Sequence, residues 1–204
     1  MYEWVASSVE LSKNVFQEFS LDWDFNLSEP ASIKEVNDCE QMLGLSFPSS
    51  YRDFLLKYNG AHFFCSHTGN LSNTYSWWAD SGIVIFGTKV LVEYWLEYER
   101  NCRENFADTE EYPQAYPLPL PIAYLGRVGT GDFCALNRDE LIESEYPVID
   151  CDHELPPCDW KKTIISNSFE EWLRKMFKRV IEHKSLPEYW FEDTLHDRSL
   201  NRMQ

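Results

Sequence analysis

The chain has 204 residues, of which 34 are Asp or Glu and 18 are Lys or Arg, so its formal charge at pH 7 is −16. This charge argues against direct binding of nucleic acid, whose phosphates would be repelled, and favours a basic protein partner. Eight Trp, eleven Tyr and thirteen Phe exclude a disordered chain and indicate one globular domain.

The first helix with clear signals begins after residue 31. Residues 1–31 mix charges with aromatic side chains, include a possible short helix at residues 9–19, and are interpreted as an N-terminal extension that packs on the body. Ser32, with Glu35 three residues later, predicts a capping box, and Gly44 is suited to end the helix in the left-handed conformation. The inner face of this helix is expected to comprise Ile33, Val36, Glu40 and Leu43, with Cys39 and Met42 adjoining.

Two further helices are predicted before the proline-rich part of the chain. The first lies within residues 48–60, where apolar side chains follow a helical i, i+3, i+4, i+7 spacing at Tyr51, Phe54, Leu55 and Tyr58. A polar loop over residues 66–81 and a strand over residues 82–87 follow. Residues 89–105 then read as a charged amphipathic helix, whose inner stripe is expected at Val92, Trp95, Leu96 and Glu99.

The second half of the chain predicts strands and one long helix. Residues 106–121 are a proline-rich connector that cannot continue a helix. Short strands are expected at residues 122–126, 133–137, 147–151 and 162–166. The last helix is expected to begin after Ser168, with Glu171 closing a second capping box, and to bury Phe169, Trp172, Leu173, Met176, Phe177, Val180 and Ile181. Residues 184–204 are interpreted as a C-terminal tail.

The stretch RVGTGDFCALN, residues 127–137, combines two glycines with an acidic residue. A phosphate-binding loop needs a helix directly after it, whereas residues typical of a strand follow here. Gly129 and Gly131 therefore predict a hairpin turn with positive φ angles. Because short strands separated by turns favour an antiparallel or mixed sheet, we predict a single α+β domain with helices flanking that sheet.

This ordered set of features resembles the SUKH superfamily, the Smi/Knr-type domains. The resemblance rests on the Ser32 to Gly44 helix, Phe47-Pro48, YRDFLLKYNG at 51–60, FG at 86–87, PIAYLGRVGTGDFCALN at 121–137, PVIDCDHE at 147–154 and SFEEWLRKMF at 168–177. It departs at Ala61, where a second glycine is common, and in the two terminal segments. The resemblance implies a SUKH-like domain over residues 32–183.

The resemblance also implies a function, a non-enzymatic binding domain. Bacterial members are commonly immunity proteins that neutralise a toxin domain, often a nuclease, encoded by a neighbouring gene. Fungal relatives act in cell-wall signalling, so a regulatory scaffold is the first alternative. The acidic charge fits the first role, because nuclease toxins are basic where they bind phosphates.

Candidate partner-binding residues come from the acidic part of the chain and from a pair of tryptophans. Residues 139–159 contain eight carboxylates and neither Lys nor Arg. Such a run is usually a solvated surface, and paired Trp residues are usually core, but both are also typical of docking surfaces. The candidates are Trp77, Trp78, Asp132, Asp139, Glu140, Glu143 and Glu145.

Catalytic, metal-binding and cofactor-binding residues are not indicated by any motif. The mixed clusters are His62, Cys65 and His67, and Asp150, Cys151, Asp152, His153 and Cys158. They lack paired C-x-x-C or H-E-x-x-H spacing, so we interpret them as ordinary turn and strand-end residues. A hydrolase built on them, for example with a Cys65–His153 dyad, is the second alternative.

A cytoplasmic location is expected, because the chain opens without the basic and apolar regions of a signal peptide and has no apolar span of membrane length. The six cysteines are accordingly expected to be reduced thiols. No membrane contact is expected, and the sequence indicates no oligomeric state.

Overall fold

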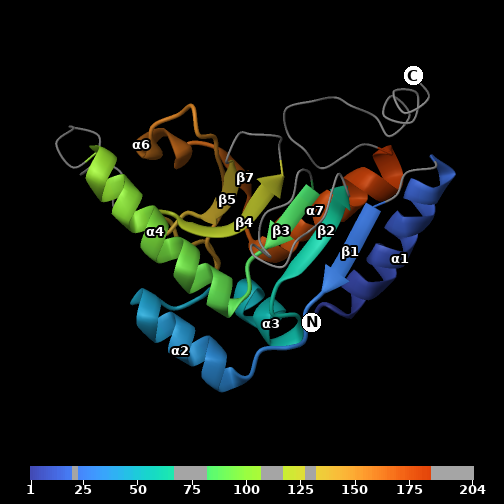
Figure 1. Cartoon of the computed structure of the whole chain (residues 1–204), viewed down its shortest axis with the longest axis horizontal. Coiled ribbons are helices and arrows are strands. Elements are labelled where there is room, and N and C mark those ends of the chain that lie inside the picture. The colour runs from blue at the N-terminus through green and yellow to red at the C-terminus, as the bar shows by residue number, and fades with distance from the viewer. Residues whose placement is uncertain (20–22, 67–81, 107–116, 127–131, 185–204) are drawn as a thin grey trace.

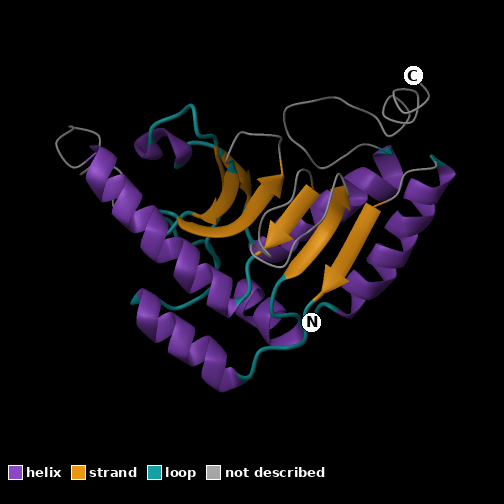
Figure 2. Cartoon of the chain, viewed as in Figure 1, coloured by secondary structure: helices purple, strands orange, loops and turns teal. Residues whose placement is uncertain are grey.

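The computed structural model describes residues 1–19, 23–66, 82–106, 117–126 and 132–184. Its strands form one seven-stranded antiparallel sheet in chain order (Figures 1 and 2). They are β1 (Trp23–Leu27), β2 (Ala61–Ser66), β3 (Gly82–Ile85), β4 (Leu120–Gly126), β5 (Phe133–Leu136), β6 (Val148–Cys151) and β7 (Ile164–Ser166). The helices are α1 (Glu3–Glu18), α2 (Ile33–Leu43), α3 (Ser49–Lys57), α4 (Thr88–Phe106), α6 (Pro157–Trp160) and α7 (Phe169–His183). The predicted α+β class is confirmed.

Helices cover both faces of the sheet (Figure 1). On one face, Phe177 of α7 packs against Phe63 of β2, with ring centroids 5.0 Å apart. On the other, Tyr98 of α4 packs against Phe133 of β5, with ring centroids 5.5 Å apart. These contacts bury apolar surface on both sides of the strands.

Residues 1–31, interpreted from the sequence as an extension, form a helix and an edge strand. β1 pairs with β2, and α1 packs against α7. Near its start, Tyr2 is fully buried and its hydroxyl donates a hydrogen bond to the Ser50 carbonyl oxygen at 2.8 Å. The first residues are therefore part of the core.

The helix boundaries follow the capping signals closely. Ser32 and Glu35 form the predicted capping box, and Gly44 ends α2 with a φ of 65°. Ser168 caps α7 by accepting a hydrogen bond from the Glu171 amide. The second capping box differs in detail, because the Glu171 carboxylate accepts from the Asn167 amide at 2.9 Å, one residue before the cap.

The predicted inner faces of two helices were partly wrong. α2 buries Val36, Cys39 and Leu43, whereas Ile33 and Met42 are 65% and 63% exposed. α4 buries Leu91, Trp95, Tyr98 and Cys102, whereas Leu96 is 59% exposed. Each helix carries more apolar positions than one face holds, and the elements packed against it decide which of them are covered.

Two strands and a short helix were not predicted from the sequence: β1, β2 and α6. In β2, the alternation of inward and outward residues is broken, because Phe63 and Phe64 are both fully buried. Phe64 has a positive φ of 59°, which places consecutive aromatic rings in the core. The predicted β4–β5 hairpin is confirmed by antiparallel pairing, but Gly129 and Gly131 lie outside the described residues.

The connection between β5 and β6 contains a two-residue turn that is attached to α3. Ile142 and Glu145 exchange backbone hydrogen bonds of 2.8 Å, and Glu143 and Ser144 between them have φ angles of 48° and 69°. Positive φ at both central residues is the pattern of a type I′ turn. We call residues 138–145 the acidic hairpin.

Glu145 holds this hairpin against the amino-terminal end of α3. Its carboxylate accepts hydrogen bonds from the Ser49 hydroxyl (2.6 Å), the Ser50 amide (2.9 Å) and the Ser50 hydroxyl (2.5 Å). The N-cap of α3 is Pro48, which has no capping side chain. Glu145 therefore supplies the negative charge that a helix amino terminus favours, from a distant part of the chain.

We expect Glu145→Gln to lower the free energy of unfolding by about 1–2 kcal/mol, because it removes a charge bound by three donors at a helix amino terminus. Urea denaturation monitored by tryptophan fluorescence measures this change. Glu143→Gln, on the exposed tip of the same turn, is the control and should change stability by less than about 0.5 kcal/mol. Equal effects of the two substitutions would contradict a capping role for Glu145.

Candidate functional site

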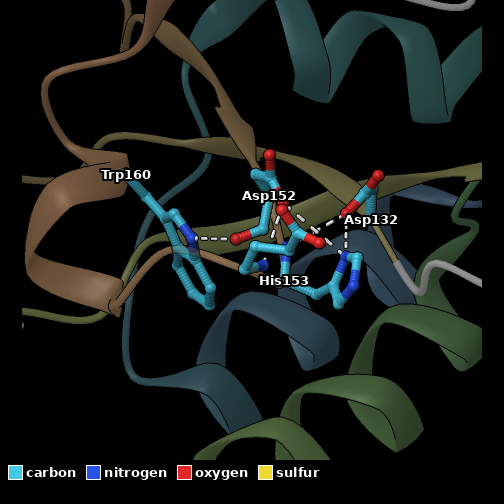
Figure 3. Close-up of polar contacts among 5 residues, drawn as sticks. Asp132, Asp152, His153 and Trp160 are labelled. Carbon is cyan, nitrogen blue, oxygen red and sulfur yellow. Dashed lines mark hydrogen bonds and ion pairs between the residues drawn. The ribbon is translucent and has the colours of Figure 1, made fainter. Parts of the chain in front are cut away.

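The pairing of β5 with β6 brings three polar residues together at one end of the sheet. Phe133 lies opposite Cys151 in this antiparallel pair. Asp132 comes directly before β5, whereas Asp152 and His153 come directly after β6, so all three emerge at the same end (Figure 3). We call them the Asp132–His153 cluster.

The cluster is centred on a buried carboxylate. Asp132 is only 2% exposed, and its Oδ1 accepts a hydrogen bond from the His153 backbone amide at 3.0 Å. The same oxygen lies 2.8 Å from His153 Nδ1, and Asp152 Oδ1 lies 3.6 Å from that nitrogen. Trp160 Nε1 donates to the Asp152 carbonyl oxygen at 2.6 Å, which ties α6 to the same site.

The acidic surroundings favour the protonated form of His153. The hydrogen bond to Asp132 raises the pKa of His153 above its ordinary value, and the charges of Asp132, Asp152 and Glu154 act in the same direction. Burial acts in the opposite direction and is second in size only to the hydrogen bond, although 47% of the imidazole side chain is exposed. The result is a half-exposed ion pair that joins the β6–α6 connection to β5.

The chemistry available to the cluster is limited. Its three side chains place possible ligand atoms within 4.8 Å of one another, so they could hold a cation. The thiol of Cys151, which directly precedes Asp152 in the sequence, is fully buried, and burial raises its pKa well above the ordinary value. A thiol in that state is a poor nucleophile.

The predicted Cys/His alternatives find little support among the described residues. Cys65 lies on β2 and His153 follows β6, and three strands separate β2 from β6 in the sheet. That separation puts the two residues beyond hydrogen-bond reach, so the suggested dyad is wrong. Burial also raises the pKa of Cys39 to about 12 and that of Cys102 to about 11. His67 lies outside the described residues.

The acidic run of residues 139–159 does not form one continuous patch. The antiparallel β5–β6 pair places the acidic hairpin at the opposite end from Asp152 and His153. Several carboxylates are engaged: Asp139 with Lys161 at 2.5 Å, Asp159 with Lys162 at 2.5 Å, and Glu145 with α3. Asp150 lies within β6 and is only 8% exposed.

The predicted partner-binding residues therefore differ in how far their side chains are exposed to a partner. Asp139, Glu140 and Glu143 are exposed on the acidic hairpin, next to Leu141, which is 64% exposed. Asp132 is buried against His153, whereas Glu145 is partly buried and its carboxylate is bound by donors of α3. Trp77 and Trp78 lie outside the described residues.

A groove between α2 and α4 was missed by the sequence analysis. It has a volume of about 320 Å³ and is lined by Glu35, Asp38, Cys39, Met42, Thr88, Lys89, Val92 and Glu93. At its floor, the Cys39 thiol donates to the Thr88 carbonyl oxygen at 3.5 Å. Nothing in the sequence indicated it, because Met42 was expected on the adjoining inner face of its helix.

The described helices offer no membrane span, since none of them is both long and apolar enough to cross a bilayer.

Comparisons with known proteins give one family and one distant relative. A model of the SMI1 / KNR4 family (SUKH-1) matches residues 30–175. The match begins after α1 and β1 and ends within α7. The chain is also 29% identical over 97 residues to a Bacillus subtilis (strain 168) protein described as "Uncharacterized protein YnaB". That alignment covers 48% of each protein, so the chain spans about half the length of this relative.

The pKa of His153, followed by NMR titration, should lie above the ordinary value of about 6.5. Because protonation then favours the folded state, the stabilisation is fully present below about pH 6.5 and is lost as the pH rises through the folded-state pKa. Asp132→Asn should lower the pKa of His153, and Asp152→Asn should lower it less, since its oxygen is farther from Nδ1. An unchanged titration in Asp132→Asn would disprove the ion pair.

We expect the purified protein to contain no stoichiometric zinc. Structural zinc sites in proteins usually use four Cys or His ligands, whereas the Asp132–His153 cluster offers one imidazole and two carboxylates. Elemental analysis of an untagged, dialysed sample tests this expectation. One zinc per chain that disappears in His153→Ala would contradict it and would revive the hydrolase alternative.

Proposed function

The chain belongs to the SMI1/KNR4 (SUKH-1) family, and from this membership we propose that it is a non-enzymatic binding protein that neutralises a cognate toxin domain. The family match over residues 30–175 is the observation that carries the proposal. In this role the protein is an immunity protein of the cytoplasm. Its partner is a basic toxin domain encoded by a neighbouring gene, with nuclease as the favoured activity.

The charge of the chain supports this choice of partner. A formal charge of −16 produces a field that attracts basic surfaces and repels nucleic acid. A nuclease needs a basic surface to bind phosphates, so an acidic protein can compete for that surface without resembling the substrate in any other way. Occlusion of the toxin's active site requires no chemistry from the inhibitor.

The acidic hairpin supplies an exposed acidic surface on which a basic partner can dock. Glu140 and Glu143 are exposed there, and neither is paired with a cation among the described residues. Between them, Leu141 is 64% exposed, which gives an apolar contact inside a charged surround. The attachment of Glu145 to α3 restrains this hairpin, which reduces the conformational entropy that is lost when a partner binds.

Trp77 and Trp78 remain part of the proposal as aromatic anchors. Tryptophan is among the residues most enriched at the energetic centres of protein interfaces. Their role is testable by Ala substitution, which should accelerate dissociation from the toxin domain while leaving association nearly unchanged.

The partner for this test is the toxin domain encoded by the neighbouring gene, with its active site inactivated. Its association rate with the chain should fall steeply as the salt concentration rises, because salt screens charge steering beyond about 8 Å at physiological ionic strength. Surface-based kinetics at two salt concentrations measure this rate. The double substitution Glu140→Gln and Glu143→Gln should slow association severalfold and reduce its salt dependence.

The matched control for this experiment removes the same charge elsewhere. Glu10→Gln with Glu182→Gln changes two exposed carboxylates on α1 and α7, with side chains 71% and 58% exposed. If this control slows association as much as the hairpin variant does, only net charge matters and the hairpin is not the docking surface. Absence of any binding would refute the immunity role itself.

A further inference from the structure

The groove between α2 and α4 has exposed apolar side chains along it. Met42 lines it from α2 and is 63% exposed, and Val92 lines it from α4. Leu96 is one turn beyond Val92 on the same side of α4 and is 59% exposed. Single exposed apolar residues are normal on protein surfaces, but Met42 and Val92 both line one groove between two helices, and Leu96 lies one turn beyond it. Figure 1 shows the two helices, α2 and α4.

The lining of the groove is acidic around this apolar strip. Glu35, Asp38 and Glu93 contribute three carboxylates and Lys89 one ammonium, so the lining carries a formal charge of 1 − 3 = −2. Lys34 pairs with Asp38 at 2.5 Å, but its side chain is 82% exposed, so solvent screens that pair. Apolar side chains with acidic side chains around them, here called the acidic rim, fit an apolar segment that is flanked by basic residues.

The acidic hairpin contacts α4, the helix that forms one wall of the groove, and α3. The Arg138 guanidinium sits over the Trp95 ring of α4 at 5.6 Å from the ring centroid, and Glu145 binds the start of α3, which follows α2. These two contacts place the hairpin next to α4 and next to the start of α3.

We propose that the α2–α4 groove receives an apolar segment of a basic protein partner, with Lys or Arg side chains of that segment reaching Asp38 and Glu93. The inference rests on the proposed function in that this partner is the same basic protein. It adds the place where the partner buries its apolar side chains, and it adds the sequence character of the segment that enters.

The probe is a synthetic amphipathic peptide of alternating Leu and Lys clusters, added to the full-length chain labelled at its methyl groups. The peptide should shift the NMR signals of the Met42, Val92 and Leu96 methyl groups in a saturable way at up to millimolar concentration. A peptide with the same Leu pattern but with Glu in place of Lys should not shift these signals, because the carboxylates around the groove would repel its Glu side chains.

Two sets of variants test the assignment. Met42→Gln with Leu96→Gln should weaken peptide binding at least about tenfold, since burying apolar side chains of this size is worth a factor of that order or more. The matched control is Leu11→Gln with Ile33→Gln, which changes two side chains that are 52% and 65% exposed but do not line the groove. The control should bind the peptide as the wild type does.

A third variant, Asp38→Asn with Glu93→Gln, keeps the apolar strip and removes two rim charges. This variant should bind the Lys peptide more weakly than the wild type does. The difference in affinity between the Lys peptide and the Glu peptide should therefore become smaller. The groove proposal is overturned if both peptides bind the wild type equally well, or if the Met42/Leu96 variant binds the Lys peptide as well as the wild type does. It is also overturned if the NMR shifts are confined to the acidic hairpin, or if no saturable shift is seen.

The same variants separate this proposal from the proposed function. If the toxin domain binds the wild type and the Met42/Leu96 variant equally well, the groove proposal fails while the immunity role stands. If the peptide enters the groove but the toxin domain does not bind the chain, the immunity role fails while the groove remains a docking site for basic apolar segments.

Discussion

The packing of aromatic side chains around α7 is the interaction on which the rest of the structure depends. Phe169 lies 5.0 Å, centroid to centroid, from both Tyr51 and Phe54 of α3, and Phe177 lies 5.0 Å from Phe63 of β2. Trp4 of α1 packs against Phe177 as well, at 5.9 Å. The last described helix thus connects the first helix, the α2–α3 region and the sheet, and aromatic burial of this extent dominates core energetics.

The strand order decides which polar residues meet. In a sheet whose strands follow one another in chain order, residues before one strand and after the next emerge at the same end. That rule brings Asp132 to His153 and separates the acidic hairpin from Asp152, although the sequence reads as one acidic run. A buried carboxylate such as Asp132 needs partners in the chain, whereas Glu140 and Glu143 can remain solvated.

Two surfaces of the chain are suited to a partner: the acidic hairpin and the α2–α4 groove. The hairpin is attached to the body of the molecule, because three donors of α3 bind the Glu145 carboxylate. The groove leaves apolar surface in water that a partner can cover. Steering by charge and anchoring by apolar contact are separate steps of association, and a binding protein needs a surface for each.

Local signals in the sequence were sufficient for the helix caps at Ser32, Gly44 and Ser168, for the stripes of α3 and α7, for the strands β3 to β7 and for the family resemblance. These depend on hydrogen bonds and periodicities within a few residues. The inner faces of α2 and α4, the strands β1 and β2, and the pairing of Asp132 with His153 were decided only by the tertiary structure. Ile33, Met42 and Leu96 are as apolar as their buried neighbours, so only the elements packed against each helix determine which side chains leave water.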